Sequence, residues 1–333
     1  MKIPGFRFFV VLTTLGAAGG CEVAHPPGNP APATQPASAP ALARHEYAQL
    51  HMGVKARIIL YAASEEIAAG AARAAYGRVA DLEDIASDYR PKSELMRLCD
   101  QAGGDPVPVS RDLFIMLRRS IDVSARSEGT FDITCGPYVR LWRQARKDAK
   151  LPAPDALREA GGRVGWDKLK LDPAKETAQL LVKGMKLDLG GIAKGYAGDL
   201  AIATLKSHGI RHALFEAGGD IVVSDPPPGT DGWRIALVPL NPREEQAIVP
   251  LSNCAVSTSG DTEQHIDIDG KRYSHIVDPR TGLGLTSRAA VTVIARSGLI
   301  ADSLSKACSI LGPEKSKALA QADGATVRFR RSE

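Results

Sequence analysis

One glycine-rich stretch of the chain has the composition of an anion-binding loop. It reads Leu-Asp-Leu-Gly-Gly-Ile-Ala-Lys-Gly-Tyr over residues 187–196. Its glycines let the backbone approach a phosphate, amide groups at a helix start point toward the anion, and Lys194 supplies positive charge. The stretch lacks the G-x-x-x-x-G-K-[ST] and G-x-G-x-x-G patterns of the common nucleotide-binding loops. It therefore predicts a phosphate cradle of another kind, and a tight turn with a solvated lysine is the plainer interpretation.

Three further stretches place acids, hydroxyls and a histidine where loops are expected. The stretch Glu-Ala-Gly-Gly-Asp at 216–220 follows an expected strand, and the stretch Thr-Ser-Gly-Asp ends at Asp261. Farther along, Tyr-Ser-His-Ile-Val-Asp-Pro-Arg-Thr-Gly spans 273–282. A loop histidine beside carboxylates can act as a general base, so His275 is a catalytic candidate. A histidine whose ring is bound by turn carbonyls explains the same position.

A fourth stretch, Ala-Asp-Ser-Leu-Ser-Lys at 301–306, lies on an expected helix. Asp302 and Lys306 are four residues apart, so they would pair on one face of that helix. Ser303 to Lys306 also fits the S-x-x-K pattern of acyl-serine enzymes, and Arg-Thr-Gly at 280–282 resembles their K-T-G motif. The two patterns occur here in reversed order, with no S-x-N between them. An acyl-serine enzyme is therefore the weaker alternative.

Apolar spacing predicts that helices and strands of one mixed α/β body position these residues. The longest expected helix opens at Ser64, a capping residue, and apolar positions recur at helical spacing from Ile67 to Ile85. Gly209 and Gly312 are expected to end two later helices. The other expected elements are strands at 54–61, 213–215 and 233–238, a helix opened by Ser110, and helices at 192–208 and about 300–311.

The N-terminus is typical of an export signal. Lys2 and Arg7 precede an apolar run at 8–15, which is too short to remain as a membrane-spanning helix. Small residues then lead to Cys21, as in bacterial lipoprotein signals, although Ala18 stands where leucine is usual. We expect a signal peptide at 1–20, an Ala/Pro-rich tether at 21–45 and one folded domain at 46–325. The predicted location is outside the cytoplasm, facing the periplasm and anchored to the membrane by a lipid on Cys21; simple secretion is the alternative.

Composition excludes several classes of protein. The chain has 333 residues, 44% of them hydrophobic, and a net charge of +4, which is not a collagen, coiled-coil or disulfide-scaffold composition. The near-neutral charge gives no nucleic-acid footprint, so no nucleic-acid partner is expected. Four cysteines lie in the body without a C-x-x-C pair or an H-E-x-x-H motif, which argues against a zinc site. We expect buried thiols, with one or two disulfides left open: Cys99, Cys135, Cys254 and Cys308.

Taken in order, the four stretches resemble the ApbE family, the FAD:protein FMN transferases. The resemblance covers about residues 47–312, and the 187–196 and 274–282 motifs are its most specific parts. Further matches are Met52-Gly53, the segments 89–95 and 129–134, and Trp142. The resemblance implies an α+β fold, a single ApbE-like (T-fold-like) mixed α/β domain. It also implies transfer of FMN from FAD to a threonine or serine hydroxyl of a target protein, with release of AMP.

The resemblance also assigns roles to residues. His275 would be the general base, with Asp261 close to it, and a magnesium ion would be held by Gly191 and Asp302 with Ser305 nearby. The acceptor would be an exported flavin-carrying subunit of a redox pump or reductase. The residues that would bind the flavin nucleotide are Met52, Tyr89, Thr130, Phe131, Asp132, Asp188, Lys194 and Ile276.

One position departs from the family pattern. Four residues after the metal-binding aspartate the family has a threonine that helps to ligate magnesium, whereas this chain has Lys306. One hypothesis is that the Lys306 ammonium partly replaces the cation; the other is that Lys306 turns to solvent and Asp302 still binds magnesium. Altered metal use also leaves two other functions open: an FAD-binding lipoprotein without transfer activity, and a hydrolase that splits FAD into FMN and AMP.

Overall fold

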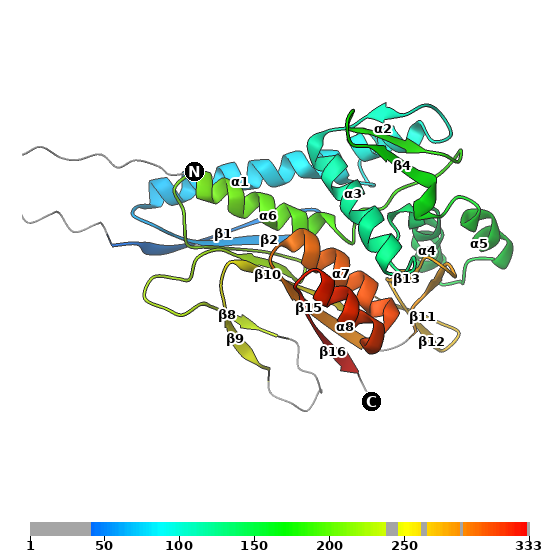
Figure 1. The fold of residues 1–333 in the computed structure, drawn as a ribbon. Coiled ribbons are helices and arrows are strands. Elements are labelled where there is room, and N and C mark those ends of the chain that lie inside the picture. Colours follow the sequence, from blue (N-terminus) through cyan, green and yellow to red (C-terminus); the bar gives the residue numbers. More distant parts are fainter. Residues whose placement is uncertain (1–40, 238–245, 261–264, 287–288, 332–333) are drawn as a thin grey trace, which may run out of the picture. The chain divides into compact units, whose positions relative to one another are not determined.

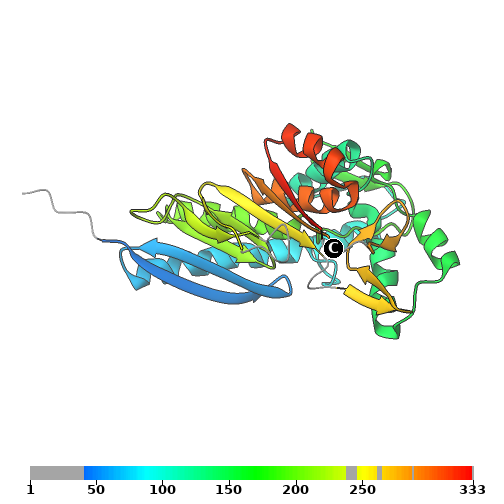
Figure 2. The same ribbon diagram turned by 90° about the horizontal axis from the view of Figure 1, so that it is seen from below.

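A seven-stranded antiparallel sheet organises the computed structural model (Figures 1 and 2), which describes residues 41–237, 246–260, 265–286 and 289–331. Neighbouring strands pair in register, for example Ile58 of β2 with Tyr47 of β1 on one side and with Phe215 of β6 on the other. In spatial order, the strands are β1 (Ala43–His51), β2 (Val54–Ala62), β6 (Ala213–Ala217), β7 (Asp220–Val223), β10 (Cys254–Gly260), β15 (Ala289–Ala295) and β16 (Thr326–Arg331).

The two faces of the sheet bury different apolar clusters, because successive side chains of a strand point to opposite faces. Ile58 and Leu60 belong to the main core, which α1 (Glu65–Ala86), α6 (Ala193–Ser207) and α7 (Gly298–Leu311) cover on one face (Figure 1). Ile59 belongs to a second cluster with Trp233 and Ile235. These two residues come from the hairpin of β8 (Trp233–Ala236) and β9 (Ile248–Leu251), which covers the other face.

Serine caps begin four of the described helices, including Ser93 before the short helix Glu94–Asp100. Ser64 Oγ accepts a hydrogen bond from the Ile67 backbone at 3.3 Å and starts α1. Ser110 likewise starts α3 (Arg111–Arg126), and Ser297 starts α7. Both caps that the sequence indicated, Ser64 and Ser110, are confirmed. Ile67 is an exception within the predicted apolar stripe of α1, because its side chain is 49% exposed in the first turn.

A second group of shorter elements packs beside the main sheet (Figure 1). Its apolar cluster joins α4 (Gly136–Asp148) to the chain around Tyr273, and Trp142 Nε1 donates to the Gly282 carbonyl at 2.8 Å. The loop at 275–284 is thereby fastened to α4. The other elements of the chain are α2 (Glu94–Asp100), β3 (Val107–Pro108), α5 (Pro154–Gly161), β4 (Leu169–Asp172), β5 (Thr177–Leu180), β11 (His265–Ile268), β12 (Lys271–Ser274), β13 (Val277–Asp278), β14 (Leu283–Gly284), α8 (Pro313–Ala322), and short 3-10 turns at Ile133–Cys135 and Trp166–Lys168.

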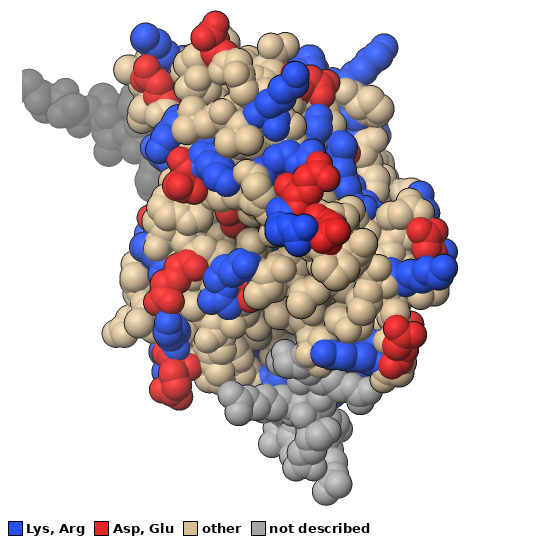
Figure 3. Space-filling model, turned by 90° about the vertical axis from the view of Figure 1, so that its right-hand side faces the viewer, with Lys and Arg blue, Asp and Glu red and all other residues tan. Residues whose placement is uncertain are grey.

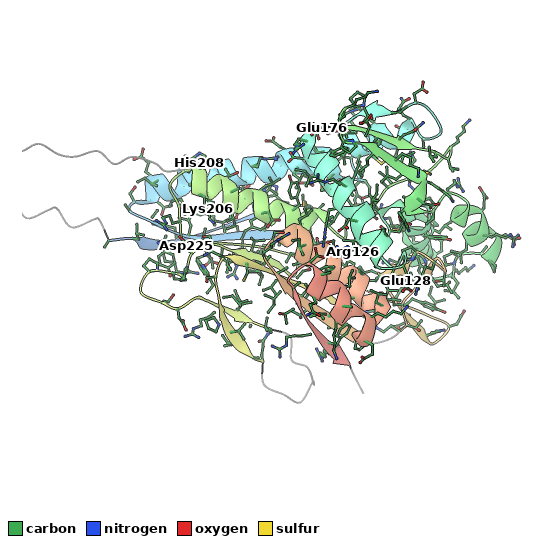
Figure 4. All side chains as sticks on the ribbon, in the orientation of Figure 1. Arg126, Glu128, Glu176, Lys206, His208 and Asp225 are labelled. Carbon is green, nitrogen blue, oxygen red and sulfur yellow. The ribbon has the colours of Figure 1, made fainter. Side chains whose placement is uncertain are left out.

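Ion pairs tie the end of α3 to the C-terminal helix α8. Arg126 contacts Asp323 at 2.8 Å, and Lys315 of α8 contacts Glu128 at 2.7 Å; Arg126 and Glu128 are labelled in Figure 4. On the molecular face shown in Figure 3, acidic and basic side chains alternate without a large patch of one sign. Exposed ion pairs of this kind contribute little to stability, so we assign them a role in orienting α8 against the end of α3.

The predicted fold class is confirmed, since helices and sheets form one mixed α/β body within residues 40–333. The expected domain at 46–325 begins within the edge strand β1, which starts at Ala43, and ends just before the other edge strand β16, which starts at Thr326. The predicted signal peptide and most of the tether lie outside the described residues, as does Val238 of one expected strand. The four body cysteines are free thiols, with Cys99 and Cys308 buried. No helix in the described ranges is long and apolar enough to cross a membrane.

Candidate active site

The crossing of α6 and α7 fixes the centre of the site. A Cβ atom at Gly195 would lie 2.1 Å from the Gly298 carbonyl oxygen, so the two helices meet backbone to backbone. This approach lets Asp302 of α7 accept a hydrogen bond from the Gly195 amide at 3.1 Å. Asp199 of α6 accepts in turn from the Gly298 amide at 2.6 Å, and burial raises the pKa of Asp199 to about 6. The predicted stretches at 187–196 and 301–306 are therefore in direct contact.

Two carboxylates and two ammonium groups gather there, and we call them the four-charge cluster: Asp220, Asp302, Lys194 and Lys306. Lys306 Nζ donates to Asp302 Oδ1 at 2.9 Å. Lys194 Nζ lies 3.3 Å from Asp220 Oδ2 and 4.0 Å from Asp302 Oδ2. Asp302 is fully buried, whereas each lysine side chain keeps 18% of its surface exposed. The lysines therefore face the surface and the carboxylates lie behind them.

The cluster holds its charges by mutual compensation. Burial would raise the pKa of Asp302, yet the Lys194 and Lys306 ammonium groups bring this pKa below its ordinary value. Burial would lower the pKa of Lys194, yet Asp302 and Asp220 raise it. Burial and the adjacent Asp302 raise the pKa of Asp220. Lys194 is thus a half-buried cation paired with carboxylates, so the interpretation of this residue as a solvated lysine does not hold.

Hydroxyl groups and aromatic surface complete the cluster. Ser305 Oγ accepts from Lys306 Nζ at 3.1 Å and lies 3.0 Å from Ser257 Oγ. A Cβ at Gly191 would lie 3.1 Å from Lys306 Cγ and 3.2 Å from Phe131 Cε2, so the chain needs glycine where these two side chains meet. The structure therefore brings together the four residues predicted for the metal site, namely Gly191, Asp302, Ser305 and Lys306.

Two of the predicted nucleotide-binding residues, Met52 and Thr130, lie on turns that approach this centre. Met52 occupies the turn between β1 and β2 at a positive φ of 50°. Val54, two residues later, lies next to Gly218. A Cβ added to Gly218 would be 3.2 Å from the Val54 side chain and 3.6 Å from Lys194 Cδ. Thr130 Oγ1 donates to the Ala307 carbonyl of α7 at 3.4 Å. The hairpin turn and the 130s turn thus approach the cluster from different elements.

Asp132 has a local role in this conformation. Its Oδ1 accepts from the Thr134 amide at 2.8 Å and from the Thr134 hydroxyl at 2.7 Å, which caps the 3-10 turn. Burial raises the pKa of Asp132. The Asp132 side chain therefore shapes the turn that carries Phe131.

Sequence reasoning missed Arg143 of α4, which joins two predicted nucleotide-binding residues. Its guanidinium contacts Asp88 at 2.6 Å and Asp188 at 3.5 Å, and lies 4.0 Å from the centre of the Tyr89 ring. Asp188 also accepts from the Gly190 amide at 2.7 Å, and burial together with Asp88 raises the pKa of Asp188. Tyr89 is 75% exposed and borders a surface depression of about 710 Å³. An exposed ring backed by a fixed cation is suited to stack on a flat aromatic ligand.

The predicted base lies on a different element from the cluster. His275 is half-buried at the bend between β12 and β13, and its loop is fastened to α4 by Trp142. The Ile276 amide next to it donates to Ser274 Oγ at 3.1 Å. Asp261, the predicted companion of His275, lies outside the described residues.

The geometry argues against an acyl-serine enzyme. Ser303 is fully buried, and its hydroxyl donates to the Leu299 carbonyl at 2.8 Å and accepts from Arg119 at 3.3 Å. The lysine of the S-x-x-K pattern, Lys306, is paired with Asp302 instead. A nucleophilic serine needs an accessible oxygen and an adjacent base, and Ser303 has neither among the described residues.

The residues around Asp302, as arranged here, do not fit the magnesium ion that the resemblance implies. Magnesium prefers oxygen ligands in octahedral geometry. One Asp302 oxygen is bonded to the Lys306 ammonium, and Ser305 Oγ is bonded to the same ammonium. Magnesium would first have to displace Lys306.

Comparison with known proteins gives the family. The profile of the ApbE family matches residues 52–329. The FAD:protein FMN transferase of Treponema pallidum is 36% identical over 253 residues, covering 71% of this chain and 70% of that protein. A Klebsiella pneumoniae protein with the same name is 32% identical over 271 residues, covering 79% and 77%. The crystal structure of the apo flavinyl transferase ApbE of Pseudomonas stutzeri superposes with a TM-score of 0.77 at 31% identity, covering 88% of this chain and 92% of that one. Sequence and fold agree, and the chain belongs to the ApbE family.

Proposed function

We propose that this protein is an FAD:protein FMN transferase, which moves FMN from FAD to a threonine or serine hydroxyl of a target protein. The relatives carry that activity in their names. The observation in this chain that carries the proposal is the pair of ammonium groups of Lys194 and Lys306, held beside a glycine-rich helix start. Such a site suits a pyrophosphate, whose negative charge needs fixed cations and backbone amides.

The proposed reaction is a displacement at phosphorus. The acceptor hydroxyl oxygen attacks the flavin-side phosphorus of FAD, and a new P–O bond forms. The bridging P–O bond of the pyrophosphate breaks, and AMP leaves with the electron pair. Negative charge on the transferring and leaving groups would be stabilised by Lys194 and Lys306, which is the main contribution a protein makes to phosphoryl transfer.

His275 is the proposed acceptor of the hydroxyl proton. A histidine in a half-buried loop can exchange a proton near neutral pH. Asp188 and Lys194 would hold FAD, with the Lys194 ammonium on its phosphates, and the exposed Tyr89 ring would stack on the flavin nucleotide. We also propose that the acceptor is an exported, flavin-carrying subunit of a redox protein. The enzyme would reach it because the enzyme is itself proposed to be exported and anchored by a lipid.

Mass spectrometry of a threonine-bearing acceptor tests this function. The full-length protein, FAD and acceptor are incubated together, and the acceptor is expected to gain one FMN unit while AMP appears in equal amount. The variant His275→Ala should lower the transfer rate by about 10²-fold or more, the usual contribution of a general base, and leave FAD binding within about twofold. His208→Ala is the matched control, because His208 lies at the far end of α6 (Figure 4).

Three results would contradict the proposal. Bound, intact FAD without AMP indicates a binding protein, and free FMN plus AMP with an unmodified acceptor indicates a hydrolase. Full transfer by His275→Ala would remove His275 from the role of base.

A further inference from the structure

We propose that Lys306 is a built-in cation that takes the place of a divalent metal ion, so that the site works without magnesium. This inference rests on the proposed transfer of FMN. It starts from the disagreement described above between the residues around Asp302 and the ligands that magnesium prefers.

The charge balance of the cluster supports the inference. Two carboxylates face two ammonium groups, so the four ionised side chains sum to zero. A divalent ion added to this arrangement would leave an excess of two positive charges next to the fully buried Asp302. Charges of like sign a few ångströms apart repel strongly where water is excluded. The four side chains therefore balance one another's charge without a metal ion, while the two buried oxygens of Asp220 make no hydrogen bond to a described residue.

The position of Lys306 is fixed from two sides. The aliphatic part of its side chain packs against the backbone of Gly191, because a Cβ added to Gly191 would lie only 3.1 Å from Lys306 Cγ. The Phe131 ring packs against the same glycine. Its ammonium donates to Asp302 Oδ1 at 2.9 Å and to Ser305 Oγ at 3.1 Å. A lysine that turned to solvent would make neither bond, so the structure favours the first of the two hypotheses about this residue.

The ammonium keeps a donor for the substrate. A lysine carries three N–H donors, and the described acceptors of Lys306 take two of them. The side chain is 18% exposed, so the third donor has access to a phosphate oxygen outside. Lys194 has a different set of partners, with Asp220 at 3.3 Å and the Gly190 carbonyl at 3.1 Å. Lys306 is thus the ammonium that occupies the direct contact with Asp302.

The test compares Lys306→Thr with the native full-length protein. Threonine removes the ammonium and offers a hydroxyl oxygen, which is a ligand that magnesium accepts. Lys315→Thr is the matched control, since Lys315 is an exposed lysine of the neighbouring helix paired with Glu128. Magnesium chloride alone is titrated into each FAD-free protein by calorimetry. FMN transfer is then measured with EDTA and with millimolar magnesium.

We expect the native protein and Lys315→Thr to show no saturable magnesium binding and transfer rates within about twofold with EDTA or magnesium. Lys306→Thr should gain one magnesium site. With EDTA, the rate of FMN transfer by this variant should fall by about 10²-fold, which is the effect of removing one preorganised charge-stabilising donor. Magnesium should restore the rate. One tightly bound magnesium in the native protein, or transfer that EDTA abolishes, overturns the inference.

Two further measurements keep the test decisive. If circular dichroism shows that Lys306→Thr does not fold, Lys306→Arg replaces it in the test. This variant keeps the positive charge and should remain active in EDTA. A magnesium requirement for transfer by Lys306→Arg or by the native protein counts against the inference. If no variant transfers FMN under any condition, the proposed function fails, while the calorimetric titrations still decide whether Lys306 excludes the metal.

Discussion

Asp302 illustrates how one buried side chain can organise the chemistry around it. It has no exposed surface, and it accepts from the Gly195 amide and the Lys306 ammonium while Lys194 lies 4.0 Å away. Removing one partner of a buried ion pair typically costs about 3–5 kcal/mol, because the other charge stays buried without compensation. Each lysine therefore stabilises the site in addition to its proposed contact with the substrate.

Arg143 provides a prediction at the same scale. Its guanidinium backs the Tyr89 ring at 4.0 Å and contacts Asp88 and Asp188. We expect Arg143→Met to weaken FAD binding by about three- to tenfold, since it removes a cation–π contact of about 1 kcal/mol and leaves two carboxylates close together. Fluorescence titration of FAD measures the change.

Arg146→Met is the control for this prediction, because Arg146 is exposed on the same helix. Unchanged FAD affinity in Arg143→Met would show that Tyr89 needs no cation behind its ring. A loss of affinity in both variants would indicate a general effect of charge on α4 instead.

Local residue pairs were predictable from the sequence, and distant ones were not. Asp302 and Lys306 pair because four residues make one helical turn, which the spacing alone indicates. Arg143 and Asp188 are 45 positions apart, and only the packing of α4 against the 187–196 loop brings them together. Asp220 was recognised as part of a glycine-rich turn, but its ion pair with Lys194 follows from the neighbouring positions of α6 and β7.

At the scale of elements, the contact between α6 and α7 is the feature that sets the site. Gly195 and Gly298 let the two helix backbones touch, and the same contact aims Asp302 at the start of α6. Small residues permit such close approach, and any side chain would force the helices apart. The glycine of the 187–196 motif therefore has a packing role as well as its expected role in the anion cradle.

This contact gives a prediction for Gly195→Ala. Its Cβ would lie 2.1 Å from the Gly298 carbonyl oxygen, so we expect a loss of about 1–3 kcal/mol in the free energy of unfolding, as in other overpacked cores. Transfer activity should fall as well, because Asp302 loses its place. Urea unfolding and the transfer assay measure the two effects.

Gly77→Ala in α1 serves as the matched control. Nothing lies within 4 Å of a Cβ at Gly77, so the substitution should stabilise the protein by up to about 1 kcal/mol through helix propensity. Equal stability changes in the two variants would contradict the packing argument.

The helix α1 and the strands β2 and β6 were predictable, whereas the edges of the sheet and the central strands β7, β10 and β15 were not. The periodicity of α1 and its Ser64 cap are local signals, and both were correctly interpreted. The edge strand β1 gives little local signal, because six of its nine residues are exposed. Its existence depends on antiparallel pairing with β2, which extends over nine registered positions and which no local pattern reveals.

At the scale of the whole molecule, one folded body carries the cluster, the Tyr89 ring and the His275 loop, and the attachment to a membrane is predicted from a separate N-terminal segment. The sequence predicts lipidation at Cys21, after an apolar run at 8–15 that is too short for a spanning helix. Acyl chains on one residue can anchor a protein without any spanning element. Location and catalysis should therefore be separable.

We accordingly expect Cys21→Ser to move the protein from the membrane to the soluble fraction while transfer to a soluble acceptor stays within about twofold. The reason is that losing the acyl chains removes about 0.8 kcal/mol of membrane binding per buried methylene, whereas the site residues all lie beyond position 50. Fractionation followed by immunoblotting and the transfer assay measure the two properties.

Cys254→Ser, at a thiol of β10, is the control and should leave fractionation unchanged. A Cys21→Ser protein that stays with the membrane, or a native protein that is soluble from the start, would refute the lipid anchor and favour simple secretion.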